Sequence, residues 1–198
     1  HRDPGITAEP ERNQRSVGRT GLVTEDGAVP ACEGAGLSRI CVVTGYKAQY
    51  VELYLGDRYR TALQAEQLGT GHAVMQAEKF MKEFTDGNTL VLCGDAPFMD
   101  SETIANALKL HEAQENAVTV ITANLEQPKG YGRILRTETG IAAIVEEKDA
   151  TEAQREIHEV NSGAYWFKTK ALLELLGGLS PVSYTHLRAH ETVLDLVC

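Results

Sequence analysis

The sequence is short of positive charge. It has 19 lysines and arginines against 28 aspartates and glutamates, and its formal net charge is −9. Proteins that bind nucleic acid neutralise its phosphates with lysine and arginine, so this balance argues against a nucleic-acid partner. A single nucleotide is not excluded, because a few backbone N–H groups and a metal ion can hold its phosphates.

Long apolar runs and closely spaced cysteine pairs are also missing. No run approaches the roughly 20 residues of a membrane span, and the first residues lack the apolar core of a signal peptide. The four cysteines show no CxxC spacing, and two of them, Cys41 and Cys93, lie inside apolar runs. This usage is typical of buried free thiols in a reducing compartment. We therefore expect a cytoplasmic protein with no membrane partner.

The middle of the chain alternates between short apolar runs and amphipathic stretches. Such alternation predicts an α/β domain with a mostly parallel sheet, whose buried strands include Val42, Leu90, Leu92, Val118 and Val120. Strands are expected at 39–45, 59–64, 89–95, 116–125 and 163–167, with a hairpin over 133–147; helices are expected at 46–56, 72–84, 101–114 and 169–176.

The two ends of the chain do not fit this pattern. Residues 1–30 have no periodic apolar face, and residues 181–198 continue no domain pattern. Both are typical of a foreign junction, and residues 1–30 are also compatible with a disordered tail. We expect residues 31–180 to form a partial domain that carries the function.

Asp95 follows the most apolar strand, directly after Gly94. In open α/β sheets, ligands bind just outside the carboxyl ends of the strands. A carboxylate at that place is suited to Mg²⁺, which prefers oxygen ligands and bridges phosphates. The alternative is that Asp95 caps the turn at Pro97.

A second candidate site begins at Gln64. Gly69 and Gly71 flank Thr70 at the start of a predicted helix, where backbone N–H groups are free for an acceptor. The Gln64 amide carries a donor and an acceptor, which matches the edge of a pyrimidine. The alternative is a plain turn with Thr70 as the N-cap, and His72 is interpreted as a helix-start residue rather than a catalyst.

Three further residues follow glycine or apolar runs. Gly132 precedes a strand, which indicates a backbone that passes close to a ligand, or else a β-bulge. Glu146 follows an apolar run and either points into a cleft or ends a solvated strand. Asn161 precedes a buried strand, where it suits a sugar hydroxyl or amide, or else a turn.

The order and spacing of these motifs resemble bacterial N-acetylglucosamine-1-phosphate uridylyltransferase, specifically the uridylyltransferase domain of that bifunctional enzyme family. The similarity covers about residues 31–180. The Gly-Asp motif is shared with sugar nucleotidyltransferases generally. The motifs are Gln-Ala-Glu-Gln-Leu-Gly-Thr-Gly-His-Ala (64–73), Gly-Asp-x-Pro (94–97), Gly-Tyr-Gly-Arg-Ile (130–134), Ile-Val-Glu-x-Lys-Asp-Ala (144–150) and Glu-Val-Asn-Ser-Gly (159–163).

The resemblance implies a Rossmann-like fold and transfer of a uridylyl group from UTP to N-acetylglucosamine 1-phosphate. Gln64 would read the uracil edge, and the backbone of Gly69 and Thr70 would support the base. Asp95 would bind Mg²⁺ between the two substrates' phosphates and so act in catalysis. Three residues would hold the sugar phosphate: Gly132, Glu146 and Asn161.

The sequence also departs from the family pattern. Nothing in residues 1–37 matches the family's first strand, its Gly-rich phosphate loop and the Pro-Lys pair that follows. A second metal ligand and the β-helical acyltransferase half have no counterpart, so oligomerisation through that half is not expected. Cys93 stands where an aromatic is common. We therefore expect poor catalysis, with two alternatives: another sugar-1-phosphate nucleotidyltransferase, or a non-catalytic fragment.

Overall fold

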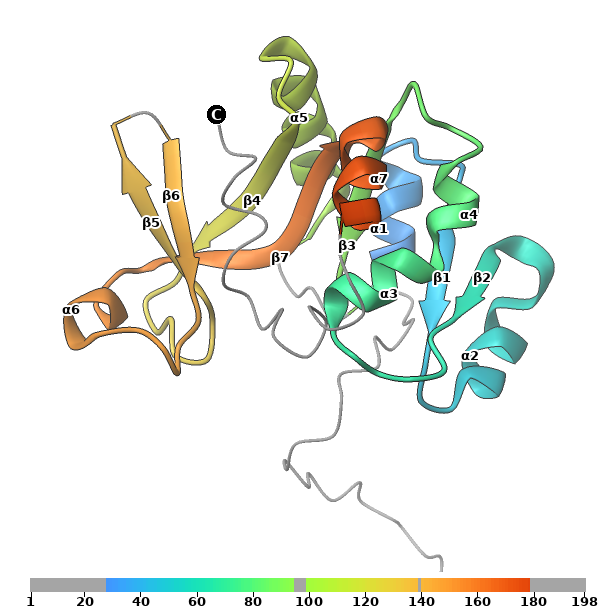
Figure 1. Cartoon of the computed structure of the whole chain (residues 1–198), viewed down its shortest axis with the longest axis horizontal. Helices are drawn as coiled ribbons and strands as arrows, with labels where there is room; N and C mark the ends of the chain where they lie inside the picture. Colours follow the sequence, from blue (N-terminus) through green and yellow to red (C-terminus); the bar gives the residue numbers. More distant parts are fainter. Residues whose placement is uncertain (1–27, 95–98, 139, 179–198) are drawn as a thin grey trace, which may run out of the picture.

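The structure, a computed structural model, describes residues 28–94, 99–138 and 140–178. Two sheets and the helices around them make up this part of the chain (Figure 1). Most of residues 1–30, and all of 181–198, lie outside the described residues, as does Asp95. The sequence predictions for those positions therefore stay predictions.

The order of strands and helices follows the sequence prediction closely. One difference is that the helix expected over 72–84 forms as two short helices, which meet at Ala77. The helices are α1 (Ala28–Gly34), α2 (Ala48–Leu55), η1 (Gly56–Arg58), α3 (Thr70–Gln76), α4 (Glu78–Met81), α5 (Ser101–Ala113), α6 (Glu152–Arg155) and α7 (Thr169–Gly178). The strands are β1 (Cys41–Thr44), β2 (Arg60–Leu63), β3 (Asn88–Leu92), β4 (Val118–Asn124), β5 (Arg133–Thr137), β6 (Gly140–Val145) and β7 (Glu159–Lys168).

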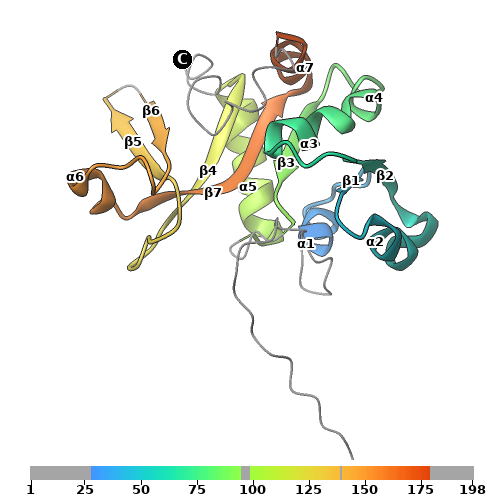
Figure 2. The same cartoon turned by 60° about the horizontal axis from the view of Figure 1, so that its bottom comes forward.

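The pairing of the strands corrects the expectation of a mostly parallel sheet. Only the β1–β2 sheet is parallel among the described residues, whereas β7 pairs antiparallel with β3, β4 and β5, and β5 pairs antiparallel with β6. Strands β3 and β4 do run in the same direction, as the crossover through α5 requires. The last strand, β7, lies between them and runs the other way (Figures 1 and 2).

The larger sheet is covered on both faces. One face packs Ile121, Ala164 and Trp166 against Ile104 of α5 and Ala31 of α1. The other face packs Val118 and Phe167 against α4 and α7, with Val74 and Met75 of α3 at its margin. The result is a helix–sheet–helix sandwich, in agreement with the α/β prediction.

Burial within the predicted core strands is uneven. Val118 is buried as expected, but Val42, Leu90, Leu92 and Val120 are half-buried. For β3 the reason is its position: it pairs with β7 on one edge and with no other described strand. None of the helices in the described ranges is long and apolar enough to cross a lipid bilayer.

Candidate functional site

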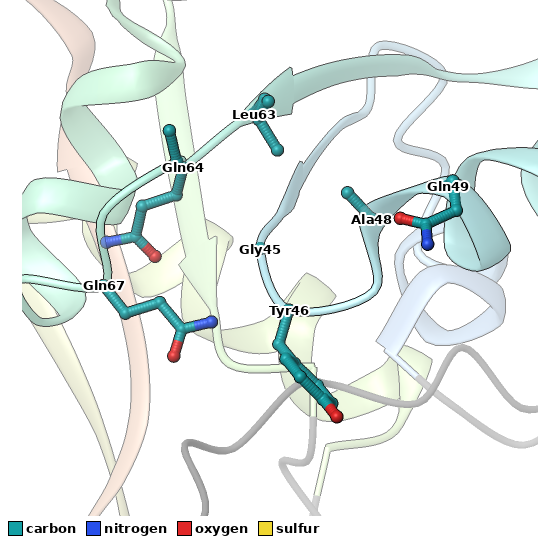
Figure 3. A pocket seen from close by; sticks show the side chains of 8 residues that line it. Gly45, Tyr46, Ala48, Gln49, Leu63, Gln64 and Gln67 are labelled. Atoms are coloured by element: carbon teal, nitrogen blue, oxygen red, sulfur yellow. The ribbon is translucent and has the colours of Figure 1, made fainter.

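A first pocket lies where β1 and β2 end. It has a volume of about 620 Å³. Figure 3 shows Gln64 and Gln67 on one side of it and Tyr46 on the other. Tyr46, Gln64 and Gln67 come from the two loops that follow the parallel strands, the place where α/β sheets bind ligands. The pocket is lined by Gly45, Tyr46, Ala48, Gln49, Leu63, Gln64, Ala65 and Gln67.

Gln64 holds this loop to the start of α3. Its amide nitrogen donates to the Gly69 carbonyl oxygen at 3.0 Å and lies 3.1 Å from Nδ1 of His72. Gly69 has φ 110° and ψ 179°, a backbone conformation that favours glycine, and the helix begins at the next residue, Thr70. Thr70 is therefore the first helical residue and not the N-cap, so the alternative of a Thr70 cap is wrong.

The structure brings Gly132, Glu146 and Asn161 together from three separate segments. A Cβ built on Gly132 would lie 3.1 Å from Cγ2 of Ile144, 3.4 Å from a carboxylate oxygen of Glu146 and 3.7 Å from Cβ of Asn161. Gly132 is buried, and the two polar residues are half-buried. Glycine is needed here because the strand backbone and these side chains pass so close to one another.

Asn161 is the centre of this cluster. Its backbone N–H donates to the Gly132 carbonyl at 2.8 Å. Its side-chain oxygen accepts from the Gly163 N–H at 3.0 Å, and its amide nitrogen donates to the Tyr165 hydroxyl at 2.6 Å. A Cβ on Gly163, where φ is +78°, would lie 3.2 Å from Sγ of Cys93. A continuous set of contacts therefore runs from Gly132 to Cys93, two positions before Asp95.

Tyr165 stays protonated at neutral pH. Burial is the largest cause that raises the pKa of its hydroxyl, to about 12; the nearby Cys93 and Glu146 raise it further, and the Asn161 hydrogen bond lowers it. A neutral phenol that already accepts from Asn161 still has a proton to donate. Glu146 lies near enough to influence it electrostatically.

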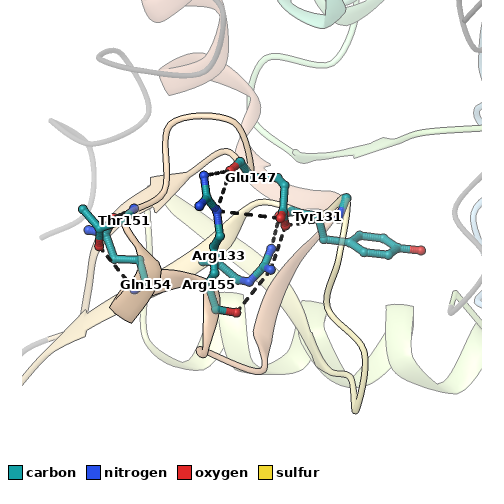
Figure 4. Close-up of polar contacts among 7 residues, drawn as sticks. Tyr131, Arg133, Glu147, Thr151, Gln154 and Arg155 are labelled. Carbon is teal, nitrogen blue, oxygen red and sulfur yellow. Dashed lines mark hydrogen bonds and ion pairs between the residues drawn. The ribbon is translucent and has the colours of Figure 1, made fainter.

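An ion pair between Arg133 and Glu147 stabilises the loop that carries Gly132 (Figure 4). The Arg133 side chain is only 2% exposed; it donates to Glu147 at 2.7 Å and to the carbonyl oxygens of Tyr131 and Arg155. The hydrogen bond from Arg133, followed by that from the Gly130 N–H, lowers the pKa of the Glu147 carboxyl. Charge pairing therefore fixes both ends of the Gly130–Gly132 turn.

The two groups of residues belong to different sheets (Figures 1 and 2): Gln64 directly follows β2 of the two-stranded sheet, whereas Gly132, Glu146 and Asn161 lie in or beside β5, β6 and β7 of the larger sheet. Gln64 lines the 620 Å³ pocket, whereas Gly132, Glu146 and Asn161 do not. Two neighbours of these groups share one core cluster: α3, which begins directly after Gly69, and Tyr165, which accepts a hydrogen bond from Asn161, both pack against it. The predicted single cleft would require Asp95, which lies outside the described residues, to join them.

The comparisons with known proteins identify the family. The chain matches the family model of nucleotidyl transferases over residues 26–197. It belongs to that family of transferases. This confirms the family resemblance that the motifs of the sequence indicate.

Relatives named bifunctional protein GlmU match this nucleotidyl transferase closely. The one from Fervidobacterium nodosum is 50% identical over 147 residues, which is 74% of this chain and 32% of the relative. The one from Levilactobacillus brevis is 44% identical over 157 residues, which is 79% of this chain and 34% of the relative. The chain thus spans about a third of the length of these curated relatives.

A solved structure supports the fold. A protein from Bacillus anthracis assigned as a glucose-1-phosphate thymidylyltransferase, with a bound sucrose, superposes with a TM-score of 0.68 at 19% identity. The superposition covers 85% of this chain and 65% of that one. At this identity the likeness concerns the fold, and it confirms the predicted Rossmann-like nucleotidyl transferase class.

The metal ligand that the sequence predicts, Asp95, lies outside the described residues. Among residues 28–94, 99–138 and 140–178, no three His, Cys, Asp or Glu side chains gather closely enough to hold a metal ion. Mg²⁺ commonly takes only one or two carboxylates and completes its shell with phosphates and water. Tyr165 lies near enough to both Cys93 and Glu146 for their charges to influence it, and Cys93 precedes Asp95 by two positions.

Several residues of these clusters were not singled out as site residues by the sequence. Tyr165 lies within an apolar strand, where an aromatic is ordinarily core. Arg133 and Glu147 lie inside recognised motifs, but their pairing across 14 positions depends on the β5–β6 hairpin. The position of His72 in the Gly-Thr-Gly-His motif could have indicated a role in the site. It is instead interpreted from the sequence as a residue at the start of a helix.

Proposed function

We propose that this chain carries the uridylyl-transfer site of a sugar-nucleotide synthase. The substrates are UTP and N-acetylglucosamine 1-phosphate, and the products are UDP-N-acetylglucosamine and pyrophosphate. The observation that supports it best is the contact of Gly132, Glu146 and Asn161, which lie far apart in the sequence and belong to three separate motifs of one family. The similarity to proteins named GlmU supports the same substrates.

The uracil base is assigned to the pocket beside Gln64. Its walls combine an amide, Gln64, with the aromatic ring of Tyr46, which is 52% exposed and can pack against a planar ring. The backbone of Gly69 and Thr70 lies next to Gln64 and would support the base from the helix start. Open pockets of this volume suit one nucleotide base with its ribose.

The sugar phosphate is assigned to the cluster around Asn161. A carboxylate such as Glu146 accepts hydrogen bonds from sugar hydroxyls, and an amide such as Asn161 pairs with hydroxyls or with an acetamido group. Gly132 leaves room for the ring next to the strand backbone. Because Arg133 and Glu147 fix this turn, little ordering would be required when the sugar binds.

The reaction requires positioning and charge neutralisation more than covalent chemistry. An oxygen of the sugar phosphate attacks the α-phosphorus of UTP, and the bond from that phosphorus to the bridging oxygen of the β-phosphate breaks. Pyrophosphate leaves with the electron pair. When bound at Asp95, Mg²⁺ would supply positive charge to the phosphates of both substrates. The residues of this chain would hold the base beside Gln64 and the sugar beside Asn161, so that the two phosphates meet between them.

A second candidate is another sugar-1-phosphate nucleotidyl transferase. The fold likeness to a thymidylyltransferase favours it, because thymine and uracil present the same hydrogen-bonding edge. A panel of UTP, dTTP, CTP, ATP and GTP with glucose 1-phosphate and N-acetylglucosamine 1-phosphate separates the two. The first proposal expects preference for UTP and for the acetamido sugar.

The test is pyrophosphate release by the full chain with Mg²⁺, UTP and N-acetylglucosamine 1-phosphate. We expect slow turnover, because no counterpart of the family's phosphate loop is recognisable in residues 1–37. We also expect measurable binding of the sugar phosphate, which Glu146→Gln should weaken. Binding of neither substrate would reject the proposal in favour of a non-catalytic fragment. The free thiols of Cys32 and Cys41 support a cytoplasmic location for this reaction.

A further inference from the structure

The amide –NH₂ of Gln64 already has hydrogen-bond partners within the protein. An amide –NH₂ has two hydrogens, and the Gln64 nitrogen faces two acceptors: the Gly69 carbonyl at 3.0 Å and Nδ1 of His72 at 3.1 Å. Figure 3 shows the nitrogen turned toward one side and the amide oxygen turned toward Gly45 and Gln67, across the pocket. The atom that remains for a ligand is therefore Oε1, a pure acceptor.

The orientation of this amide depends on the protonation of the His72 ring. A neutral imidazole has one acceptor nitrogen and one N–H. Gln76 lies at the other ring nitrogen, with its amide nitrogen 3.1 Å from Nε2 and 3.1 Å from the His72 carbonyl. Only one of the two glutamines can donate to a neutral ring, so the tautomer of His72 and the two amide orientations are linked.

The tautomer with Nδ1 unprotonated satisfies Gln64 completely. Both amide hydrogens of Gln64 then have acceptors. Nε2–H can donate to Oε1 of Gln76 once that amide turns over, with loss of the hydrogen bond from Gln76 to the His72 carbonyl within the helix. In the other tautomer Gln64 must turn its oxygen toward the ring, which brings this oxygen against the Gly69 carbonyl and breaks the hydrogen bond that closes the loop between β2 and α3. The Gln76 side chain projects from the same helix as His72, one turn later, and joins no second segment.

We propose that His72 is a positioning residue that selects the base by holding the Gln64 amide with its oxygen toward the pocket. This inference rests on the proposed function. Uracil and thymine present a donor, N3–H, on their pairing edge, whereas N3 of cytosine is an acceptor. A Gln64 amide that presents only its oxygen to the base pairs with the former and repels the latter, since two acceptors would face each other.

The first experiment compares affinities for UTP and CTP in the full chain and two variants. His72→Asn keeps a polar atom near the place of Nδ1, whereas His72→Leu removes the acceptor. We expect the preference for UTP over CTP to fall about tenfold in His72→Leu, the effect of about one hydrogen bond, and to stay within about threefold in His72→Asn. A structural role alone would weaken both nucleotides equally and leave the ratio unchanged.

The second experiment reads the tautomer of His72 directly in the wild-type chain. Two-bond ¹H–¹⁵N correlation spectra of the wild-type chain report which ring nitrogen of each histidine is protonated, and the spectrum of His72→Asn identifies the His72 signals by their loss. We expect Nδ1 unprotonated. A protonated Nδ1, or an unchanged nucleotide ratio in His72→Leu, overturns the inference. A wild-type chain that binds neither nucleotide instead overturns the proposed function, while the tautomer still decides whether His72 can hold Gln64 in this way.

Discussion

The amide nitrogen of Asn161 donates a hydrogen bond to the hydroxyl of Tyr165 at 2.6 Å, within the same strand. This bond joins a polar residue of the candidate sugar site to an aromatic ring on the face of the sheet that α4 and α7 cover. The binding site and the core are therefore coupled through one side chain, and a change at Tyr165 should affect both.

Tyr165→Phe should cost about 1–2 kcal/mol of unfolding free energy, because it leaves a half-buried amide donor without its acceptor. It should also weaken sugar-phosphate binding, since Asn161 is then free to rotate. Urea unfolding and isothermal titration measure the two effects. If stability falls and binding stays unchanged, Asn161 is not held in place by Tyr165.

Alkaline pH should destabilise the protein. Burial, the largest cause, raises the pKa of Tyr165 from 10.0 to about 12, and burial likewise raises the pKa of Cys32 from 9.0 to about 11. Above its ordinary pKa each group ionises in the unfolded chain but stays protonated when folded, so the unfolded state is favoured as pH rises. The loss should be up to about 1.4 kcal/mol per pH unit for each group, between pH 9 and 11 for Cys32 and between pH 10 and 12 for Tyr165.

The variant Tyr165→Phe separates the two contributions. Its unfolding free energy should still fall between pH 9 and 11, because Cys32 ionises in the unfolded chain over this range. Between pH 11 and 12 it should fall less than in the wild type, because phenylalanine at position 165 does not ionise. Measurements of urea midpoints across this range give the comparison. Equal slopes for the variant and the wild type between pH 11 and 12 would contradict the assignment to Tyr165.

Gly132→Ala should impair the sugar site more than it impairs folding. The new Cβ would lie 3.1 Å from Ile144 and 3.4 Å from the Glu146 carboxylate, so Glu146 must move. We expect sugar-phosphate affinity to fall about tenfold or more, equivalent to about 1.4 kcal/mol, with nucleotide affinity unchanged. Gly177→Ala in α7, where a Cβ meets nothing within 4 Å, is the matched control and should leave both affinities intact.

Ile104→Ala tests the core assignment. Ile104 is fully buried between α5 and the sheet, and its carbonyl oxygen accepts from the indole N–H of Trp166. Loss of this side chain should cost about 2–5 kcal/mol. The exposed Leu53, at 83%, provides the comparison, and Leu53→Ala should change stability by less than about 0.5 kcal/mol. Similar costs at the two positions would mean that α5 does not pack as described.

The sequence predicted the strands and helices well because the spacing of apolar residues that defines each element lies within a short stretch of the chain. Val118 and Ile104, for example, repeat at strand and helix spacing and are buried. Strand pairing was harder to predict, because β7 enters between β3 and β4 only after the β5–β6 hairpin, and no local pattern records that return. The half-buried state of Leu90 and Leu92 follows from the same arrangement.

In the candidate site, too, the residues within local motifs could be predicted, whereas contacts between distant segments could not. The motifs indicated Gly132, Glu146 and Asn161, and the fold brings them into contact. Their supports could not be predicted, because the Arg133–Glu147 pair and the Asn161–Tyr165 bond depend on hairpin register and on side-chain direction. For Gln64 the residue type indicated base recognition. That its amide –NH₂ pairs within the protein could be seen only once the structure placed His72 beside it.

The insertion of β7 has a consequence for how the chain reaches its native state. Among the described strands, β3 and β4 share no hydrogen bonds and both pair with β7, so these pairings form only once the chain is complete through Lys168. Thr89, at the start of the sheet, meets the hydroxyl of Thr169 across a separation of 80 positions. Such distant pairing slows folding and leaves apolar strand edges open meanwhile. During synthesis on the ribosome, the earlier strands must therefore wait for β7, and this interval is when the nascent chain is most exposed to aggregation and most dependent on chaperones.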